Sequence, residues 1–204
     1  IPYQGVWLEF EAEPDGYIGV KIDRHRKTPA TVLLRIFGMT DNEEMIKVFG
    51  EGIKPTLKKD SSKDVKDAYL EIYKRIRPGD LATPENAKSL IDAMFHRSDR
   101  YNLSAVGRFK LNQRLGKKSG DSKVLLLDDL TLIIKEILRL NSIQTQDPDD
   151  IDHLGNRRVR PVGELLQNRL RMALTKQRRI IQDRMSTLDM KTLTPAQLIS
   201  ARSL

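Results

Sequence analysis

The stretch DDIDHLGNRRVR, residues 149–160, places three carboxylates, one imidazole and three guanidinium groups within twelve residues. Carboxylate oxygens are ligands that divalent cations prefer, and polymerases and nucleases hold two cations with paired aspartates. The candidate ligands are Asp149, Asp150, Asp152 and His153. The arginines that follow can neutralise these carboxylates without a metal, so the pattern favours a salt-bridged loop and we expect no metal site. A third interpretation is a surface that reads nucleic acid.

Basic residues concentrate directly after this stretch. Between Arg157 and Ser186 there are nine lysines and arginines against Glu164 and Asp183, so this window carries +7 of the formal net charge of +8. Lysine and arginine neutralise phosphates, which favours a polyanionic partner. The alternative is that these residues form the solvated or interfacial face of an amphipathic helix.

Several classes of function are disfavoured by what the sequence lacks. There is no cysteine, which excludes disulfides, thiol catalysis and zinc ribbons. No Gly-x-Ser-x-Gly elbow and no glycine-rich phosphate loop is present. No apolar run approaches 18 residues and no signal pattern opens the chain, so we expect a cytoplasmic protein without membrane contact. Because the chain opens with Ile1, we expect it to be part of a longer protein.

The elements that must position these residues are one hairpin and a series of helices. Apolar and polar residues alternate on both sides of the turn PDG within residues 7–22, which predicts a β-hairpin. Helical spacing and capping patterns predict helices near residues 29–38, 40–50, 64–78, 83–95, 103–116, 128–140, 162–185 and 194–200. The expected N-terminal caps include Thr40 with Glu43, Thr83, and Thr194 with Gln197. The fold class is therefore α+β, mostly α, with one N-terminal β-hairpin followed by seven or eight helices.

Two features indicate a boundary near residue 148. The segment NSIQTQDPDD, residues 141–150, is polar and rich in turn-forming residues. All eleven aromatic residues lie between Tyr3 and Phe109, so the C-terminal part must pack with aliphatic side chains.

Five segments, read in order, resemble the beta subunit of bacterial RNA polymerase: GVWLEFE, KIDRHRKTPATVLLR, IRPGD, DRYNLSAVGRFKLN and DDIDHLGNRRVRPVGELLQNRLRMAL. The resemblance runs over nearly the whole chain and is weakest across residues 50–66 and 115–146. It implies that residues 1–148 form the lobe (beta2-like) domain. Residues 149–204 would hold a loop and the returning helical segment of the protrusion (beta1-like), completed by polypeptide outside this sequence.

The resemblance also implies a role without catalysis. The catalytic aspartates and the magnesium of that enzyme belong to the beta prime subunit, so we expect this chain to need no cofactor and to be inactive alone. Expected partners are DNA (the non-template strand and the downstream duplex), the rest of beta, and the beta prime, alpha and sigma subunits. Transcription factors are possible partners, and a module that docks such factors is the alternative function. A metal nuclease using residues 149–153 is a third, disfavoured one.

The resemblance assigns roles to particular residues. Positions matching Ile151, Asp152 and Arg157 help to form a pocket for an unstacked guanine of the non-template strand. A carboxylate can accept hydrogen bonds from guanine, and arginine can donate to the base or a phosphate. Further positions are expected on surfaces that face DNA: Trp7, Asp23, Arg24, Arg77 and Arg108. The sequence departs from the family pattern at His25, where arginine is common, so a phosphate contact there is expected to be weaker or pH-dependent.

Overall fold

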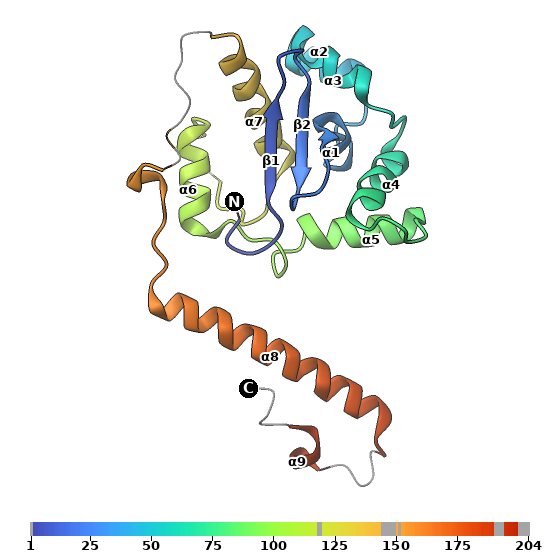
Figure 1. Cartoon of the computed structure of the whole chain (residues 1–204), viewed down its shortest axis with the longest axis vertical. Helices are drawn as coiled ribbons and strands as arrows, with labels where there is room; N and C mark the ends of the chain where they lie inside the picture. The colour runs from blue at the N-terminus through green and yellow to red at the C-terminus, as the bar shows by residue number, and fades with distance from the viewer. Residues whose placement is uncertain (1, 118–119, 144–149, 151, 190–193, 200–204) are drawn as a thin grey trace. The chain divides into compact units, whose positions relative to one another are not determined.

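The computed structural model describes residues 2–117, 120–143, 150, 152–189 and 194–199. The chain divides into two compact units, residues 1–146 and residues 147–204. Each unit is described by itself below. The α+β, mostly α fold class is confirmed: a small antiparallel sheet near the N-terminus is followed by helices (Figure 1). No helix in the described segments has the length and apolar character needed to cross a membrane.

The hairpin predicted from the alternating pattern is present. β1 (Leu8–Ala12) pairs antiparallel with β2 (Ile18–Ile22), with Phe10 opposite Val20. The turn between them suits its residues: Gly16 adopts a φ of 83°, which favours glycine, and the Asp15 carboxylate accepts a hydrogen bond from the Tyr17 amide at 3.0 Å. Alternation and turn chemistry together therefore fix the register of this hairpin.

A third strand was not predicted. β3 (Thr28–Pro29) pairs with β2, so the sheet has the order β1-β2-β3. The Thr28 hydroxyl also donates to the Val20 carbonyl at 3.2 Å. Two residues are too few to show an alternating pattern, so no local pattern indicates this strand. Pro29 consequently precedes the first helix and does not occupy its first turn.

The described residues of the first unit form seven helices after the sheet: α1 (Ala30–Ile36), α2 (Asn42–Phe49), α3 (Lys54–Lys59), α4 (Val65–Ile76), α5 (Pro84–Phe95), α6 (Ser104–Arg114) and α7 (Leu127–Asn141). A 3-10 turn, η1 (Gly50–Ile53), joins α2 to α3. The structure corrects the sequence prediction in two places. Neither η1 nor α3 was predicted, and α2 is capped by Asp41, whose side chain accepts from the Glu43 amide, where Thr40 was expected.

The core of this unit surrounds α1. Every residue of α1 is buried, and the helix contacts β2, α4 and α7. Its one charged side chain, Arg35, donates to the Asp60 carboxylate at 3.2 Å and to Asn42, so both buried charges are paired. Figure 1 shows α1 beside the sheet with α4 and α5 on its outer side.

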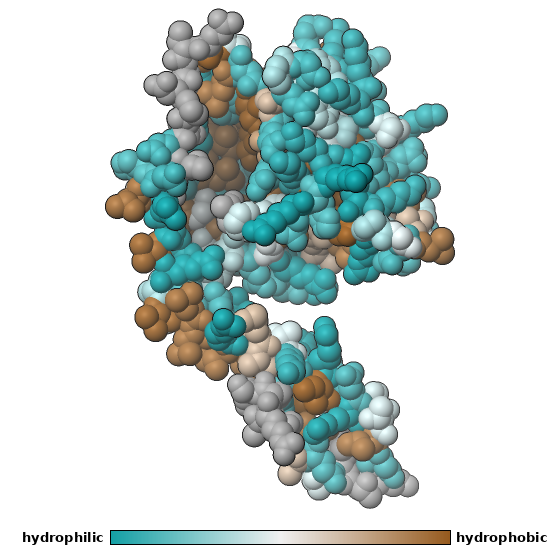
Figure 2. Space-filling view, viewed as in Figure 1, coloured by the Kyte–Doolittle hydropathy of each residue, from teal (hydrophilic) through white to brown (hydrophobic). Residues whose placement is uncertain are grey.

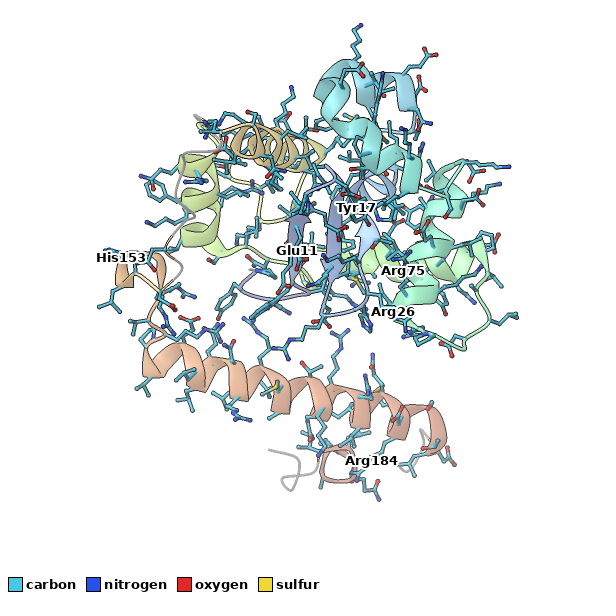
Figure 3. All side chains as sticks on the ribbon, turned by 45° about the horizontal axis from the view of Figure 1, so that its top comes forward. Glu11, Tyr17, Arg26, Arg75, His153 and Arg184 are labelled. Carbon is cyan, nitrogen blue, oxygen red and sulfur yellow. The ribbon has the colours of Figure 1, made fainter. Side chains whose placement is uncertain are left out.

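The second unit contains the 3-10 turn η2 (Leu154–Asn156), the long helix α8 (Val162–Thr187) and the short helix α9 (Pro195–Leu198). The predicted cap of α9 is confirmed, because Thr194 and Gln197 form a capping box. Arg184 of α8 donates to the carbonyls of Gln197 and Leu198 at the end of α9 (Figure 3). These contacts hold α9 against the C-terminal part of α8.

Candidate nucleic-acid interface

The segment between β2 and β3 is a tight turn with an unusual backbone. The His25 amide donates to the Ile22 carbonyl at 3.0 Å, and the two residues between them, Asp23 and Arg24, have φ angles of 47° and 66°. Positive φ at both central positions is the pattern of a type I′ turn, which favours Asn-Gly or Asp-Gly. Aspartate tolerates this conformation, but arginine at the second position costs the fold free energy.

The strained turn brings Arg24 to the only tryptophan of the sequence. The Arg24 guanidinium carbon lies 5.9 Å from the centroid of the Trp7 ring, and the Asp23 amide donates to the Trp7 carbonyl at 2.9 Å. Trp7 is 38% exposed although tryptophan is usually well covered. Arg26, two residues beyond Arg24, is also exposed (Figure 3). The turn therefore presents an accessible aromatic face with cationic side chains next to it.

The loop at residues 150–160 is exposed and held by its own side chains. The Asp150 carboxylate accepts hydrogen bonds from the amides of Asp152 and His153, at 3.0 and 3.2 Å. The His153 Nδ1 accepts from the Gly155 amide at 3.1 Å (Figure 3). Two of the four candidate ligands, Asp150 and His153, thus accept hydrogen bonds from the backbone. Within the part of the chain that the structure describes, no group of three possible ligands gathers in one place.

Asp152 and Arg157 do meet. Their side chains are 85% and 64% exposed, and the nearest guanidinium nitrogen and carboxylate oxygen are 3.7 Å apart. At that distance and exposure the pair contributes little to stability, roughly 0–1 kcal/mol. Both groups keep free hydrogen-bonding capacity toward a ligand. Ile151 and Asp149 lie outside the described residues.

The next arginine of the loop has a structural partner. Arg158 forms a two-pronged ion pair with Glu164 in the first turn of α8, at 3.0 and 2.6 Å. Such paired hydrogen bonds are stronger and more directional than a single contact. This pair ties the loop to the helix that follows, so the exposed Asp152 and Arg157 project from an anchored segment.

Arg77 lies at the C-terminal end of α4. Its side chain is 53% exposed, and it is 3.8 Å from Asp80, three residues along the chain. A contact this long and exposed leaves the guanidinium accessible, as expected for a residue that faces solvent or DNA.

The prediction that Arg108 lies on a DNA-facing surface is wrong. Its side chain is 6% exposed and donates to the Asp129 carboxylate at 2.8 Å and to the carbonyls of Ser122 and Val124, both at 2.6 Å. Lys117 donates to the other Asp129 oxygen at 3.1 Å. All sides of this guanidinium are therefore occupied by the chain itself, and Arg108 joins α6 to α7 and to the segment between them.

The sequence pattern of α6 is misleading because two of its large apolar side chains face outward. Phe109 and Val106 are 65% and 51% exposed, whereas Arg108 turns inward. An inward-facing arginine needs a buried acid, and Asp129 lies 21 residues away in the sequence. Without knowledge of the tertiary structure, nothing local identifies that partner.

Asp129 provides a prediction for the pH dependence of stability. Burial alone would raise the pKa of its carboxyl group, but hydrogen bonds from Arg108, the Leu126 amide and Lys117 outweigh burial and lower the pKa below the ordinary 3.8. Because this pKa is lower in the folded state than in the unfolded state, the ionised Asp129 stabilises the fold above pH 3.8. That stabilisation is lost as the pH falls through the folded-state pKa.

We therefore expect Asp129→Asn to reduce the free energy of unfolding at neutral pH, and the difference from the unmodified chain to shrink once the pH falls well below 3.8. Urea unfolding at several pH values measures this difference. A difference that stays constant across the acidic range would show that the Asp129 charge has no role in stability.

Comparison with known families identifies the family of the chain. A family model described as RNA polymerase Rpb2, domain 2, matches residues 1–160, which is more than half of the chain. The chain belongs to this family of RNA polymerase subunit domains. The enzyme in which the family occurs, DNA-directed RNA polymerase, is a nucleotidyltransferase, and membership implies association with its other subunits.

The predicted site residues that the structure describes, all except Ile151, thus fall into four groups. Trp7, Asp23 and Arg24 come together at one turn. Asp152 and Arg157 come together in the second unit, while Arg77 lies at the end of α4. Arg108 is buried in the core and is not part of an exposed site. Sequence reasoning missed that Trp7 and Arg24 form a cation–π pair, since the pairing depends on the unpredicted type I′ turn.

Proposed function

We propose that this chain is a non-catalytic, DNA-guiding module of RNA polymerase that contacts the non-template strand and downstream DNA. The observation that carries the proposal is the Trp7–Arg24 pair on the strained turn between β2 and β3. An exposed aromatic ring offers a stacking surface to an unpaired base of any sequence. Arginine beside it can bind the neighbouring phosphate without contributing sequence preference.

The energetic cost of the turn supports this role. Glycine would adopt the backbone of Arg24 without strain, yet the position carries the larger side chain. Backbone strain of this kind, of order 1–3 kcal/mol, persists where the surrounding structure enforces it and is concentrated at functional sites. The guanidinium of Arg24 is the group that the strain places over Trp7.

We propose a second element of the same function at the loop of the second unit. Asp152 and Arg157 would read an unstacked guanine of the non-template strand, with Ile151 as their neighbour in the sequence. The weak, exposed pairing of the two side chains supports this role, because each can exchange its partner for a base at little cost.

The experiment that tests the Trp7–Arg24 site compares two substitutions of the same residue. Arg24→Ala should weaken binding of single-stranded DNA for all sequences alike and lower the salt slope of log K by about 0.7–0.9. Arg24→Gly should weaken DNA binding equally and at the same time raise the free energy of unfolding by about 1 kcal/mol, because the strain is relieved. Fluorescence anisotropy at several salt concentrations and urea unfolding measure the two effects.

The matched control is Arg139→Ala on α7, which also removes one exposed arginine engaged with a near neighbour, Glu136. It should leave the salt slope nearly unchanged. If Arg139→Ala and Arg24→Ala weaken binding to the same extent, the turn is no specific site and net charge alone attracts DNA. Binding that is insensitive to salt in every variant would favour a module that docks proteins.

A further inference from the structure

β1 is an edge strand, and its register determines which backbone groups point outward. At the two ends of the β1–β2 ladder the Asp23 amide donates to the Trp7 carbonyl and the Glu13 amide donates to the Tyr17 carbonyl, at 2.9 and 2.8 Å. In this register the odd-numbered residues of β1 exchange hydrogen bonds with β2. The N–H and C=O groups of Leu8, Phe10 and Ala12 therefore point to the other side, away from β2.

That outer edge is open in the described part of the chain. The sheet ends at β1, and no backbone or side-chain hydrogen bond from a described residue reaches the outward groups of Leu8, Phe10 or Ala12. Proteins commonly guard such edges with proline, a bulge or a covering helix. β1 has neither proline nor bulge, since its five residues pair one to one with β2.

The side chains around this edge differ between the two faces of the sheet. Leu8 and Phe10 are half-buried and pack against the core, on the face that covers α1. On the opposite face Glu9 is exposed and has no ion-pair partner among the described residues, whereas Glu11 is paired with Lys21 and Lys27. Figure 3 shows Glu11 on β1. An added strand would meet apolar neighbours on one face and a free carboxylate on the other.

An apolar surface continues beyond the edge. α7 extends past β1 on the side away from β2, and its other end passes behind the sheet (Figure 1). Its Ile133 and Ile137 are half-buried. Figure 2 shows hydrophobic side chains at the bottom of a hollow over α7 next to the sheet. A strand added to β1 would cover part of this surface as well as the unpaired backbone.

We propose that the outer edge of β1 binds an extended segment of another polypeptide as an added antiparallel strand, with alternating apolar and basic side chains. Apolar residues of the segment would share the face of Leu8 and Phe10, and basic residues would face Glu9. Backbone hydrogen bonds supply the affinity in this mode of recognition, and the alternating side chains supply the specificity. This site uses the outward backbone groups of the strand that follows Trp7, and the proposal does not depend on the proposed function.

The charges at the edge argue against two other occupants, a second copy of the chain and nucleic acid. In antiparallel pairing of β1 with β1 of a second copy, Glu9 and Glu11 would face one another, and like charges opposite each other destabilise a sheet. Nucleic acid would bring phosphates next to the unpaired Glu9, and a free strand edge offers it no matching backbone. A polypeptide with basic residues at alternate positions satisfies both the hydrogen bonds and the charge.

The test uses the whole chain and a capped seven-residue peptide of alternating lysine and valine, labelled for fluorescence anisotropy. In the antiparallel arrangement valines lie opposite Leu8, Phe10 and Ala12, so the valine amides donate to β1 and the lysine amides point away. Methylation of the valine amide nitrogens should therefore weaken binding at least about tenfold. Methylation of the lysine amide nitrogens is the matched control and should change binding little.

Two measurements on the protein complete the test. Amide exchange followed by NMR should show fast exchange at Leu8, Phe10 and Ala12 in the free chain and slow exchange with the peptide, while Glu9 and Glu11 exchange slowly in both. Glu9→Lys should weaken the lysine peptide about tenfold and favour a glutamate–valine peptide. If the valine-methylated peptide binds as tightly as the unmethylated peptide, the proposal is wrong. Protection of these amides by self-association of the chain or by single-stranded DNA would also overturn it.

Discussion

Replacing Asp129 by alanine is expected to lower the free energy of unfolding by about 3–5 kcal/mol, because the change leaves a buried guanidinium without its counter-charge. Arg108 and Asp129 are almost inaccessible to solvent, with side chains 6% and 1% exposed. The loss also frees the Leu126 amide, which donates to Asp129 at 3.0 Å at the start of α7. A chain of this size has a total stability of only about 5–15 kcal/mol, so the variant should be close to unfolding.

The neighbouring acid provides the matched control. Asp128 is 72% exposed and pairs with Lys117 at 2.9 Å, so Asp128→Ala should cost at most about 1 kcal/mol. Urea unfolding of both variants measures the difference. Losses of similar size would mean that burial of the Arg108–Asp129 pair does not determine its contribution.

The same contacts change what is expected of Arg108→Ala. A surface contact with phosphate would predict weaker DNA binding with normal stability. The buried position predicts a loss of stability comparable to that of Asp129→Ala, and a loss of DNA binding only in proportion to the unfolded fraction. A DNA titration that counts only the folded fraction distinguishes a phosphate contact from a structural role of Arg108.

The second large effect is expected at Asp152. In RNA polymerase that contains this chain, Asp152→Ala should remove about 1–3 kcal/mol of preference for guanine over thymine at one non-template position, just downstream of the active site. If Asp152 only neutralised Arg157 on the surface, its loss would cost roughly 0–1 kcal/mol and would scarcely affect the polymerase. The measurement compares the stability of promoter complexes on templates that differ at that one base.

Asp150→Ala is the control for this prediction. Asp150 holds the loop through the amides of Asp152 and His153, so its loss should weaken complexes on both templates to the same extent. If Asp152→Ala also weakens the complexes on both templates equally, Asp152 holds the loop and does not read a base. An unchanged preference would exclude the base contact.

Patterns that depend on residues close in the sequence predicted most of the fold. The hairpin followed from alternation around PDG, and α5 begins where Thr83 caps the Asn86 amide at 3.3 Å, as predicted. α3 was missed because Lys54–Lys59 has few apolar residues, and what fixes it is tertiary: the buried hydroxyl of Thr56 accepts from the Ile18 amide at 2.9 Å. Propensity within six residues cannot reveal such a contact.

The candidate site was predictable only where family resemblance and exposure coincide. Trp7 and Arg24 lie where a ligand could reach them, as the resemblance implies, but their pairing depends on backbone angles that the residue types disfavour. The prediction for Arg108 was wrong because resemblance at one position says nothing about whether the side chain faces solvent. The free edge of β1 follows from the register and the sheet order, and both require the tertiary structure.

The placement of the aromatic residues has a spectroscopic consequence. Trp7 is the only indole of the chain, and it lies under Arg24, so its intrinsic fluorescence reports on that turn alone. Because the last aromatic residue is Phe109, the whole second unit is invisible in near-ultraviolet circular dichroism, while α8 dominates its far-ultraviolet signal. Melting curves in the near-ultraviolet range therefore follow the first unit alone, whereas those in the far-ultraviolet range follow the helices of both units, without any added label.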